Sequence, residues 1–142
     1  MRPRHRALLV DDHQPLAEAT AEFLQAYGLD VKIASTGHEA LEIASAFEPE
    51  IVLCDQRLPD MEGVDVARAL RRRPGGSRVV IAIHTAMSET LASGLVPTAR
   101  AVVDQILRKP ITTEALDALV AQLESKTAKK RSGLKSRRAR DG

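Results

Sequence analysis

Short, fully apolar runs that end in polar residues are the feature that most limits how this chain can fold. Residues 7–10, 51–54 and 79–83 are apolar at every position, and each run is followed by an acidic residue or by His and Thr. Continuously apolar strands are buried on both faces, as in a parallel sheet with helices on each side. No run approaches the roughly 18 residues of a membrane-spanning helix. The pattern therefore predicts an α/β domain.

The segments between these runs have the periodicity of helices. Apolar residues recur every three or four positions, and Thr36 and either Thr112 or Thr113 stand where helix N-caps are needed. Helices are predicted over residues 15–27, 36–47 and 63–73, with a last one that begins after residue 112 or 113. Two further strands are predicted at residues 31–34 and 106–107. The first helix is expected to bury Leu16, Ala19, Thr20, Phe23, Leu24 and Tyr27.

Five strand–helix units within residues 1–125 fit a doubly wound parallel sheet. In such sheets ligands bind beyond the carboxyl ends of the strands, so functional residues are expected just after each strand. The least regular stretch is residues 85–105, where Gly94 and Pro97 interrupt any long helix. We expect one short helix near residues 88–95 and an irregular connection after it.

The net charge of +2 combines two unlike parts of the chain. Residues 1–125 carry 13 Lys and Arg against 18 Asp and Glu, whereas residues 126–142 carry eight basic residues against Asp141 alone. We expect an acidic domain over residues 1–125 and a basic tail over residues 126–142 that is disordered or a frayed helical extension. Because the tail leaves no room for a folded output domain, output is expected from protein contacts or from the tail.

Cys54 and the N-terminus bear on the location of the protein. A lone cysteine cannot form an internal disulfide, which fits a reducing compartment. The apolar run that follows the basic N-terminal residues is too short for the core of a signal peptide. We therefore expect a cytoplasmic protein that has no membrane partner.

Three carboxylates, a hydroxyl and a lysine follow the predicted strands. Asp11 and Asp12 come after the first strand, Asp55 after the third, Thr85 after the fourth and Lys109 after the fifth. Each alone fits a turn or a helix cap, but such explanations do not account for all of them together. Clustered carboxylates suit Mg²⁺ or Mn²⁺ together with phosphate oxygens. Asp55 is then the natural nucleophile toward a phosphoryl group, with Lys109 as counter-cation and Thr85 as hydroxyl donor.

Four short motifs contain these residues. They are Leu9-Val10-Asp11-Asp12, Asp55-Gln56-Arg57-Leu58-Pro59-Asp60-Met61-Glu62-Gly63, Thr85-Ala86 and Lys109-Pro110. In order and approximate spacing, the set resembles the receiver domain of two-component response regulators over about residues 5–125. The resemblance implies a flavodoxin-like fold, with five parallel strands in the order 2-1-3-4-5.

The same resemblance implies a phosphorylation switch. A histidine kinase or a histidine phosphotransfer protein would phosphorylate Asp55, and the chain would catalyse only its own phosphorylation and dephosphorylation. Mg²⁺ would be bound by Asp12, Asp55 and the backbone carbonyl of Arg57, with Asp11 acting mostly through water. The sequence does not identify the downstream protein, and it leaves open whether two copies of the chain pair.

The readout that the resemblance implies is altered in this chain. Lys109 would pair with Asp55 or its phosphate, and Thr85 would move to hydrogen-bond the phosphoryl oxygen. The family usually carries Tyr or Phe three residues before the lysine, where this chain has Ile106. A switch through an aromatic rotamer is therefore not expected, and a backbone shift of residues 88–105 is the alternative hypothesis.

Several residues beside the motifs have simpler interpretations. His84 is interpreted as a packing residue at a strand end, and Cys54 as small core filler. The basic run at residues 71–73 fits the negative end of a helix dipole. The positions at which the family tunes hydrolysis or the switch are Arg57, Met87 and Ala86.

Three other functions stay open on the sequence alone. A phosphatase of the haloacid dehalogenase type also uses Asp, Thr, Lys and Mg²⁺, but its nucleophile follows the first strand in an Asp-x-Asp pattern. A receiver-like adaptor would act without phosphorylation. The basic tail could bind nucleic acid through phosphates, although it has no aromatic residue to stack on bases. A solubilising or partner-binding tail is the simpler interpretation.

Overall fold

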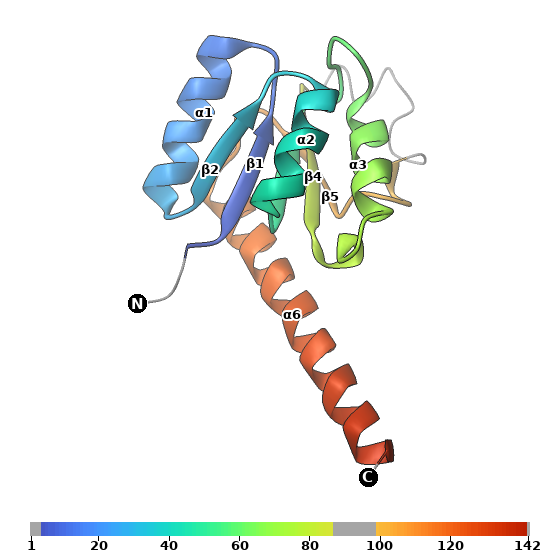
Figure 1. The fold of residues 1–142 in the computed structure, drawn as a ribbon. Helices are drawn as coiled ribbons and strands as arrows, with labels where there is room; N and C mark the ends of the chain where they lie inside the picture. Colours follow the sequence, from blue (N-terminus) through green and yellow to red (C-terminus); the bar gives the residue numbers. More distant parts are fainter. Residues whose placement is uncertain (1–3, 87–98, 142) are drawn as a thin grey trace.

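A five-stranded parallel sheet forms the centre of the molecule (Figure 1). The structure is a computed structural model that describes residues 4–86 and 99–141, with side chains through residue 129. The strands are β1 (Arg6–Val10), β2 (Asp30–Ala34), β3 (Ile51–Cys54), β4 (Val80–Thr85) and β5 (Gln105–Arg108). Their order is β2-β1-β3-β4-β5 and each neighbouring pair is parallel, which confirms the predicted topology.

Helices cover both faces of this sheet. They are α1 (Gln14–Tyr27), α2 (Gly37–Phe47), α3 (Gly63–Arg71) and α6 (Thr113–Asp141), with a short 3₁₀ helix, η1 (Gly76–Arg78), before β4. Residues of α2 and α3 share one hydrophobic cluster, and residues of α1 and α6 share another. The doubly wound α/β arrangement is therefore confirmed.

Alternate residues of each central strand feed the two clusters. In β1, Leu8 and Val10 pack on the side of α2 and α3, whereas Ala7 and Leu9 pack on the side of α1 and α6. Every residue of β3 and β4 is buried. Burial on both faces is the physical reason that these strands are apolar throughout.

The ends of the elements follow from local chemistry. Gly28 ends α1 with a left-handed backbone (φ 119°), which a residue without a side chain adopts freely. Thr36 caps α2 by accepting a hydrogen bond from the Glu39 N–H (3.0 Å), and Thr112 accepts one from the Ala115 N–H at the start of α6 (3.1 Å). The third helix ends two residues earlier than predicted, because the N–H groups of residues 72 and 73 close a turn at that point.

The predicted buried face of α1 is wrong in part. The helix buries Ala17, Thr20, Ala21 and Leu24, whereas Leu16 and Phe23 are 36% and 37% exposed. The prediction gave weight to the large apolar residues of the stripe. The helix instead presents alanines to the sheet, which lets its backbone lie close to the strands.

The last helix continues past residue 125 without a break (Figure 1). The boundary predicted there is a change of charge and not of backbone structure. Lys126, which the charge count assigns to the tail, contacts the folded domain through the carbonyls of Ser77 and Val79. Met87 and the short helix expected near residues 88–95 lie outside the described residues. Among the helices that are described, none has a stretch long and apolar enough to cross a membrane.

Candidate functional site

The carboxyl edge of the sheet gathers the residues that the sequence singles out. The Asp11 N–H donates to the Ala34 carbonyl (3.0 Å), and the Asp55 N–H donates to the Val10 carbonyl (2.9 Å). The Lys109 N–H donates to the carbonyl of Thr85 (3.0 Å). These bonds extend the parallel ladder by one residue beyond each strand, so the polar side chains start from neighbouring positions.

Lys109 lies between two carboxylates. Its Nζ is 3.2 Å from Asp55 Oδ2 and 3.5 Å from Asp11 Oδ2. The side chain of Asp11 is 2% exposed and that of Asp55 is 12% exposed, whereas Asp12 is exposed to solvent. The Asp11 side chain also accepts a hydrogen bond from the His13 N–H (2.9 Å). One cation therefore faces two enclosed anions, with a third carboxylate nearby.

The three aspartates fit a hard metal ion. Asp11, Asp12 and Asp55 each offer one carboxylate oxygen, and these oxygens lie within 4.8 Å of one another. A donor set made only of carboxylate oxygens matches the preference of Mg²⁺, which takes a few carboxylates and completes its shell with water and phosphate. Arg57, whose carbonyl is the further ligand expected from the sequence, lies in an isolated bridge with Glu62, and its side chain is exposed.

Burial and the close approach of Lys109, Asp55 and Asp11 shift the pKa values of Lys109 and Asp55. Burial alone would lower the pKa of Lys109, but Asp55 and Asp11 more than offset it, and the pKa is raised above its usual value. Burial and the neighbouring Asp11 raise the pKa of Asp55, and Lys109 offsets only part of that effect. The ionised Asp55 carboxylate is therefore held at a cost in free energy, which an additional cation would relieve.

The loop after β3 is fixed from two sides. The Gly63 N–H donates to the Gln56 carbonyl (2.8 Å), and a Cβ at residue 63 would collide with the Asp55 carbonyl oxygen. On the outer side, Asp60 accepts hydrogen bonds from the N–H groups of Gly37 (2.8 Å) and His38 (2.9 Å) and contacts His38 Nδ1 (2.6 Å). Asp60 thus binds the first turn of α2, where backbone N–H groups are otherwise unpaired.

This role of Asp60 is absent from the sequence reasoning. The bond with His38 and those with the two N–H groups hold its pKa well below the usual range. The sequence does indicate that a further acceptor is needed, since Thr36 can bond only some of the free N–H groups of the helix that it caps. Nothing in the sequence says that residue 60, rather than water, supplies the remaining acceptor.

Thr85 and Ile106, two of the residues tied to the readout, lie in strands of the sheet. Thr85 is fully buried at the end of β4, and Ala86 beyond it is exposed. Ile106 pairs with Ile83 in the β4–β5 ladder and packs, partly buried, against the cluster under α2 and α3. An aliphatic side chain therefore stands in the strand at the position where the receiver family usually carries Tyr or Phe.

His84 and Cys54 are buried, in agreement with their interpretation as packing residues. Burial lowers the pKa of His84 to about 4, and the nearby Lys109 adds to this effect, so the imidazole is neutral at pH 7. Burial raises the pKa of the Cys54 thiol well above its usual value, with a further contribution from Asp55, so the residue is not a reactive thiolate.

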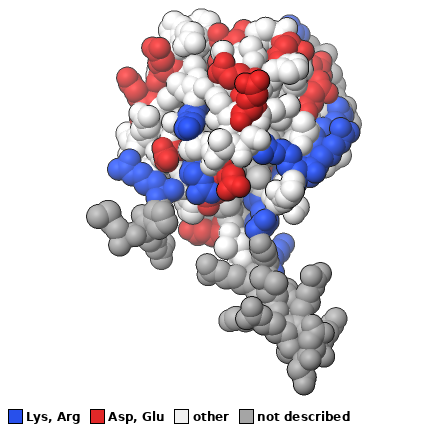
Figure 2. Space-filling model, in the orientation of Figure 1, with Lys and Arg blue, Asp and Glu red and all other residues white. Residues whose placement is uncertain are grey.

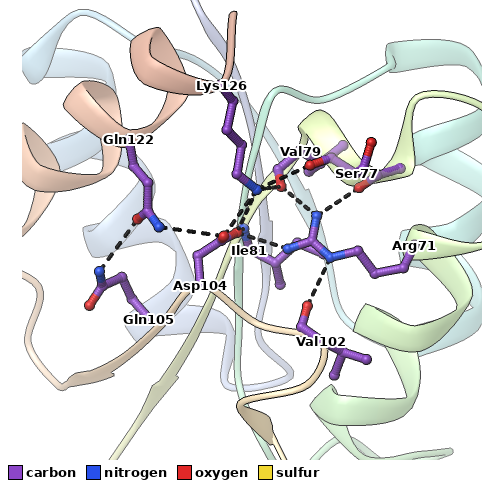
Figure 3. Close-up of polar contacts among 10 residues, drawn as sticks. Arg71, Ser77, Val79, Ile81, Val102, Asp104, Gln105, Gln122 and Lys126 are labelled. Carbon is purple, nitrogen blue, oxygen red and sulfur yellow. Dashed lines mark hydrogen bonds and ion pairs between the residues drawn. The ribbon is translucent and has the colours of Figure 1, made fainter. Parts of the chain in front are cut away.

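A second charged cluster lies at the opposite, amino edge of the sheet (Figure 3). Asp104, just before β5, accepts hydrogen bonds from Arg71 (2.8 Å), from Lys126 (3.2 Å) and from the Ile81 N–H (2.8 Å). The guanidinium of Arg71 also donates to the carbonyls of Gly76, Val79 and Val102. Burial alone would raise the pKa of Asp104, but these donors hold it below its usual value.

This cluster corrects the interpretation of the basic run at residues 71–73. Arg71 is not explained by a helix dipole alone, because it joins α3 to the turn before β5 and to η1. Arg73 also donates to the Leu41 carbonyl and to Ser45 Oγ of α2. Sequence reasoning misses such links because the partners are mostly backbone carbonyls, which any residue supplies.

The comparisons agree with this geometry. A family model described as the response regulator receiver domain matches residues 7–121. A DNA-binding response regulator, MtrA, of Mycolicibacterium smegmatis is 39% identical over 88 residues, which is 62% of this chain and 37% of that protein. A sensor histidine kinase, AtsR, of Burkholderia thailandensis is 30% identical over 121 residues, which is 84% of this chain and 20% of that protein. The chain thus spans well under half the length of these relatives.

Solved structures show the same fold. A response regulator receiver domain of Methylobacillus flagellatus, described as CheY-like, superimposes with a TM-score of 0.74 at 26% identity, covering 85% of this chain and 99% of that one. A response regulator structure from Chloroflexus aurantiacus gives a TM-score of 0.72 at 27% identity, with 89% and 99% covered.

The fold and the comparisons together define a signalling domain of the flavodoxin-like α/β class. The chain belongs to the response regulator receiver domain family of two-component signalling. Members of this family bind Mg²⁺ at an acidic pocket and interact with histidine kinases, and Asp11, Asp12 and Asp55 of this chain form an acidic cluster whose geometry could hold a metal ion.

Proposed function

We propose that this domain accepts a phosphoryl group on Asp55 from a histidine kinase or a histidine phosphotransfer protein in the cytoplasm, and passes the signal on by protein contacts. The observation that carries the proposal is the placement of Lys109 between Asp55 and Asp11, with Asp12 within reach of the same metal position. A signalling role suits the receiver family better than turnover of external phosphate esters, which the phosphatase alternative requires.

The proposed reaction is a single phosphoryl transfer. A carboxylate oxygen of Asp55 attacks the phosphorus of a phosphohistidine, and a P–O bond forms while the P–N bond breaks. The electron pair of the broken bond stays on the imidazole nitrogen of the donor. The product on this chain is an acyl phosphate at the end of β3.

The other residues bind and orient the transferred group. Lys109 holds the Asp55 carboxylate at 3.2 Å and remains next to the phosphoryl oxygens once the bond forms. The Thr85 hydroxyl is the proposed donor to one of those oxygens. Asp11, Asp12, Asp55 and the Arg57 carbonyl would hold Mg²⁺ or Mn²⁺, which neutralises phosphoryl charge when bound.

Acyl-phosphate labelling tests the proposal directly. The full chain is incubated with Mg²⁺ and acetyl phosphate, and its intact mass is measured. The wild type is expected to gain one phosphoryl group, and Asp55→Asn none. Asp30→Asn, an exposed carboxylate at the start of β2, is the matched control and should label fully. A wild type that fails to label would leave the phosphorylation-independent adaptor as the function.

The readout requires a second measurement because Ile106 replaces the expected aromatic. We propose that phosphorylation shifts the backbone between β4 and β5. Hydrogen exchange of residues 99–106 should change when the chain is phosphorylated, since Val102 and Asp104 bind α3 and β4 in that stretch. Unchanged exchange in a fully labelled sample would contradict this readout while leaving phosphoryl transfer intact.

A further inference from the structure

The basic residues of the folded domain gather at the amino edge of the sheet, where α6 leaves the domain. In Figure 2, Lys and Arg form a belt across the lower half of the visible face, whereas most Asp and Glu lie over the upper half. The basic edge is defined here as the partly or fully exposed side chains of Arg72, Arg73, Arg78 and Lys129. This edge lies opposite the acidic pocket.

A hollow of about 460 Å³ marks the centre of the basic edge. Arg73 and Arg78 line it from the turn between α3 and β4, and Leu123 and Thr127 line it from α6. Within the part of the chain that the structure describes, the guanidinium groups of Arg72 and Arg78 have no hydrogen-bond or ion-pair partner. These charges are therefore available to a ligand.

The acidic residues at this edge are largely paired. Glu50, which also lines the hollow, binds Arg6 (3.5 Å) and His5 (3.2 Å). Asp104 is bound by Arg71 and Lys126. Asp30, Glu48 and Glu124 are exposed carboxylates that remain at this edge, against the four basic side chains that define it, so a small excess of positive charge is left.

The partly buried cluster around Asp104 (Figure 3) places the beginning of the basic part of α6 beside this edge. Lys126 donates to the carbonyls of Ser77 (3.2 Å) and Val79 (2.9 Å), the two residues that flank Arg78. It also binds Asp104 (3.0 Å). The helix therefore leaves the domain next to Arg78, and its sequence adds six more Lys and Arg after Lys129 against Asp141 alone.

We propose that the basic edge, together with the Lys- and Arg-rich sequence of α6 after Lys129, binds the phosphate backbone of a nucleic acid duplex, independently of base sequence. The surface is separate from the acidic pocket, so its activity does not depend on phosphoryl transfer at Asp55. The basic helical segment after Lys126 is roughly 20 Å long at 1.5 Å per residue. A duplex carries about one charge per 1.7 Å of its axis, which makes it a matching linear anion.

The sequence of the segment disfavours the two nearest alternatives. A helix that lies on a membrane needs a large apolar face with Leu, Phe or Trp, and residues 126–141 contain Leu134 alone of these types. Single-stranded nucleic acid is usually held by stacking on aromatic side chains, and the segment has none. Binding through phosphates of a duplex needs neither.

The test is the salt dependence of binding by the full chain. Fluorescence anisotropy is measured with two duplexes of unrelated sequence and about 20 base pairs, across roughly 50 to 200 mM salt. The wild type should bind both duplexes equally, and log K should fall linearly with log salt. The double variant Arg72→Gln and Arg78→Gln should make the slope shallower by about 2, since each lost phosphate contact removes about 0.9.

Two further variants serve as controls for the double variant. Arg108→Gln removes one exposed charge at the opposite edge and should leave the slope unchanged. Asp55→Asn should bind as the wild type does, which separates this proposal from phosphoryl transfer. The proposal is overturned if the wild type does not bind duplex or if the edge variant keeps the wild-type slope. It is also overturned if polyglutamate or anionic vesicles compete as well as duplex, since the surface would then fit an acidic protein or a membrane.

Discussion

Two clusters of charged side chains lie at opposite edges of one sheet, and they are balanced in opposite ways. At the carboxyl edge, a single cation, Lys109, faces the enclosed carboxylates Asp11 and Asp55, with Asp12 beside them. The cluster keeps negative charge that the described residues do not neutralise. Such an excess is costly, and it suits a site that binds cations and handles phosphoryl groups.

At the amino edge the balance is reversed. One carboxylate, Asp104, is bound by two cations, Arg71 and Lys126, and by the Ile81 N–H. Each of these donors also comes from a different element, so the cluster joins α3, β4 and α6. The difference teaches that burial and charge do not by themselves mark a functional site. What separates the two clusters is whether the chain completes its own pairing.

The largest expected effect is on the completed cluster. Asp104→Ala should lower the free energy of unfolding by about 3 kcal/mol, because it leaves two half-buried cations without a counter-ion and the Ile81 N–H without an acceptor. Urea unfolding measures the change. Asp30→Ala, at an exposed carboxylate, is the control and should change stability by less than about 0.5 kcal/mol. Should Asp104→Ala fail to fold, Asp104→Asn keeps the acceptor for Ile81 and should show a smaller loss. Equal stability of Asp104→Ala and the control would contradict a structural role.

The next largest effect is expected from Mg²⁺, which should stabilise the protein through the carboxyl-edge cluster and not through the amino-edge cluster. At ten times its dissociation constant, Mg²⁺ should raise the free energy of unfolding by about 1.4 kcal/mol, because it binds the folded site alone. Asp12→Asn should abolish the increase. Asp104→Asn should show the same increase, although its free energy of unfolding without Mg²⁺ is lower than that of the wild type. Thermal unfolding with and without Mg²⁺ is the measurement. A response that survives Asp12→Asn would place the metal elsewhere.

A smaller effect of opposite sign is expected at Asp55, the proposed phosphoacceptor. Without Mg²⁺ at pH 7, Asp55→Asn should stabilise the fold by about 1 kcal/mol, because it removes a carboxylate whose ionised form is disfavoured by burial and by Asp11. The stabilised variant should be unable to accept a phosphoryl group. A loss of stability would show that the Lys109 pair outweighs the repulsion between carboxylates.

The pH dependence should also differ in sign between the clusters. The pKa of Asp104 is lowered by folding, so its contribution is present above the unfolded value of about 3.9 and is lost as pH falls through the folded value. The stability gap between wild type and Asp104→Asn should therefore narrow in acid. The pKa of Asp55 is raised, so the advantage of Asp55→Asn should already vanish as pH falls toward its unfolded value. Unfolding curves measured at a series of pH values test both trends. The comparison is wrong if acid changes the stability of the wild type relative to Asp104→Asn in the same direction as it changes that of the wild type relative to Asp55→Asn.

Much of the fold follows from local sequence, because burial on both faces leaves a strong mark. The third strand, Ile51–Cys54, has the bounds that its apolar run predicts, since every position is buried. The buried face of α1 is harder to predict from the sequence. Leu16 and Phe23 are large and apolar but exposed, while Ala17 and Ala21 pack on the sheet. The size of a residue says little about which side of a helix meets the sheet when close approach favours alanine.

The candidate site also contains residues that the sequence predicts and contacts that it does not. Asp55 and Lys109 are predictable because chemistry and fold both require polar residues after strands, and parallel strands bring those positions together. The contacts of Asp60, Arg71 and Asp104 are not, because they depend on backbone groups brought close only by tertiary packing. A sequence carries no record of which carbonyl or N–H lies near a given side chain.

The backbone contact between residue 63 and Asp55, the proposed phosphoacceptor, limits how this domain can vary. Any side chain at residue 63 would strike the carbonyl oxygen of Asp55, and any at residue 37 would strike Met61 in the same loop. In a saturation library, residue 63 should therefore accept almost nothing but glycine, whereas residue 37 should tolerate small side chains when the flexible Met61 side chain moves aside. Arg57 has an exposed side chain that faces no such barrier. Position 57 is thus open to variation at the rim of the acidic cluster, whereas the backbone contact beneath it restricts residue 63 to glycine.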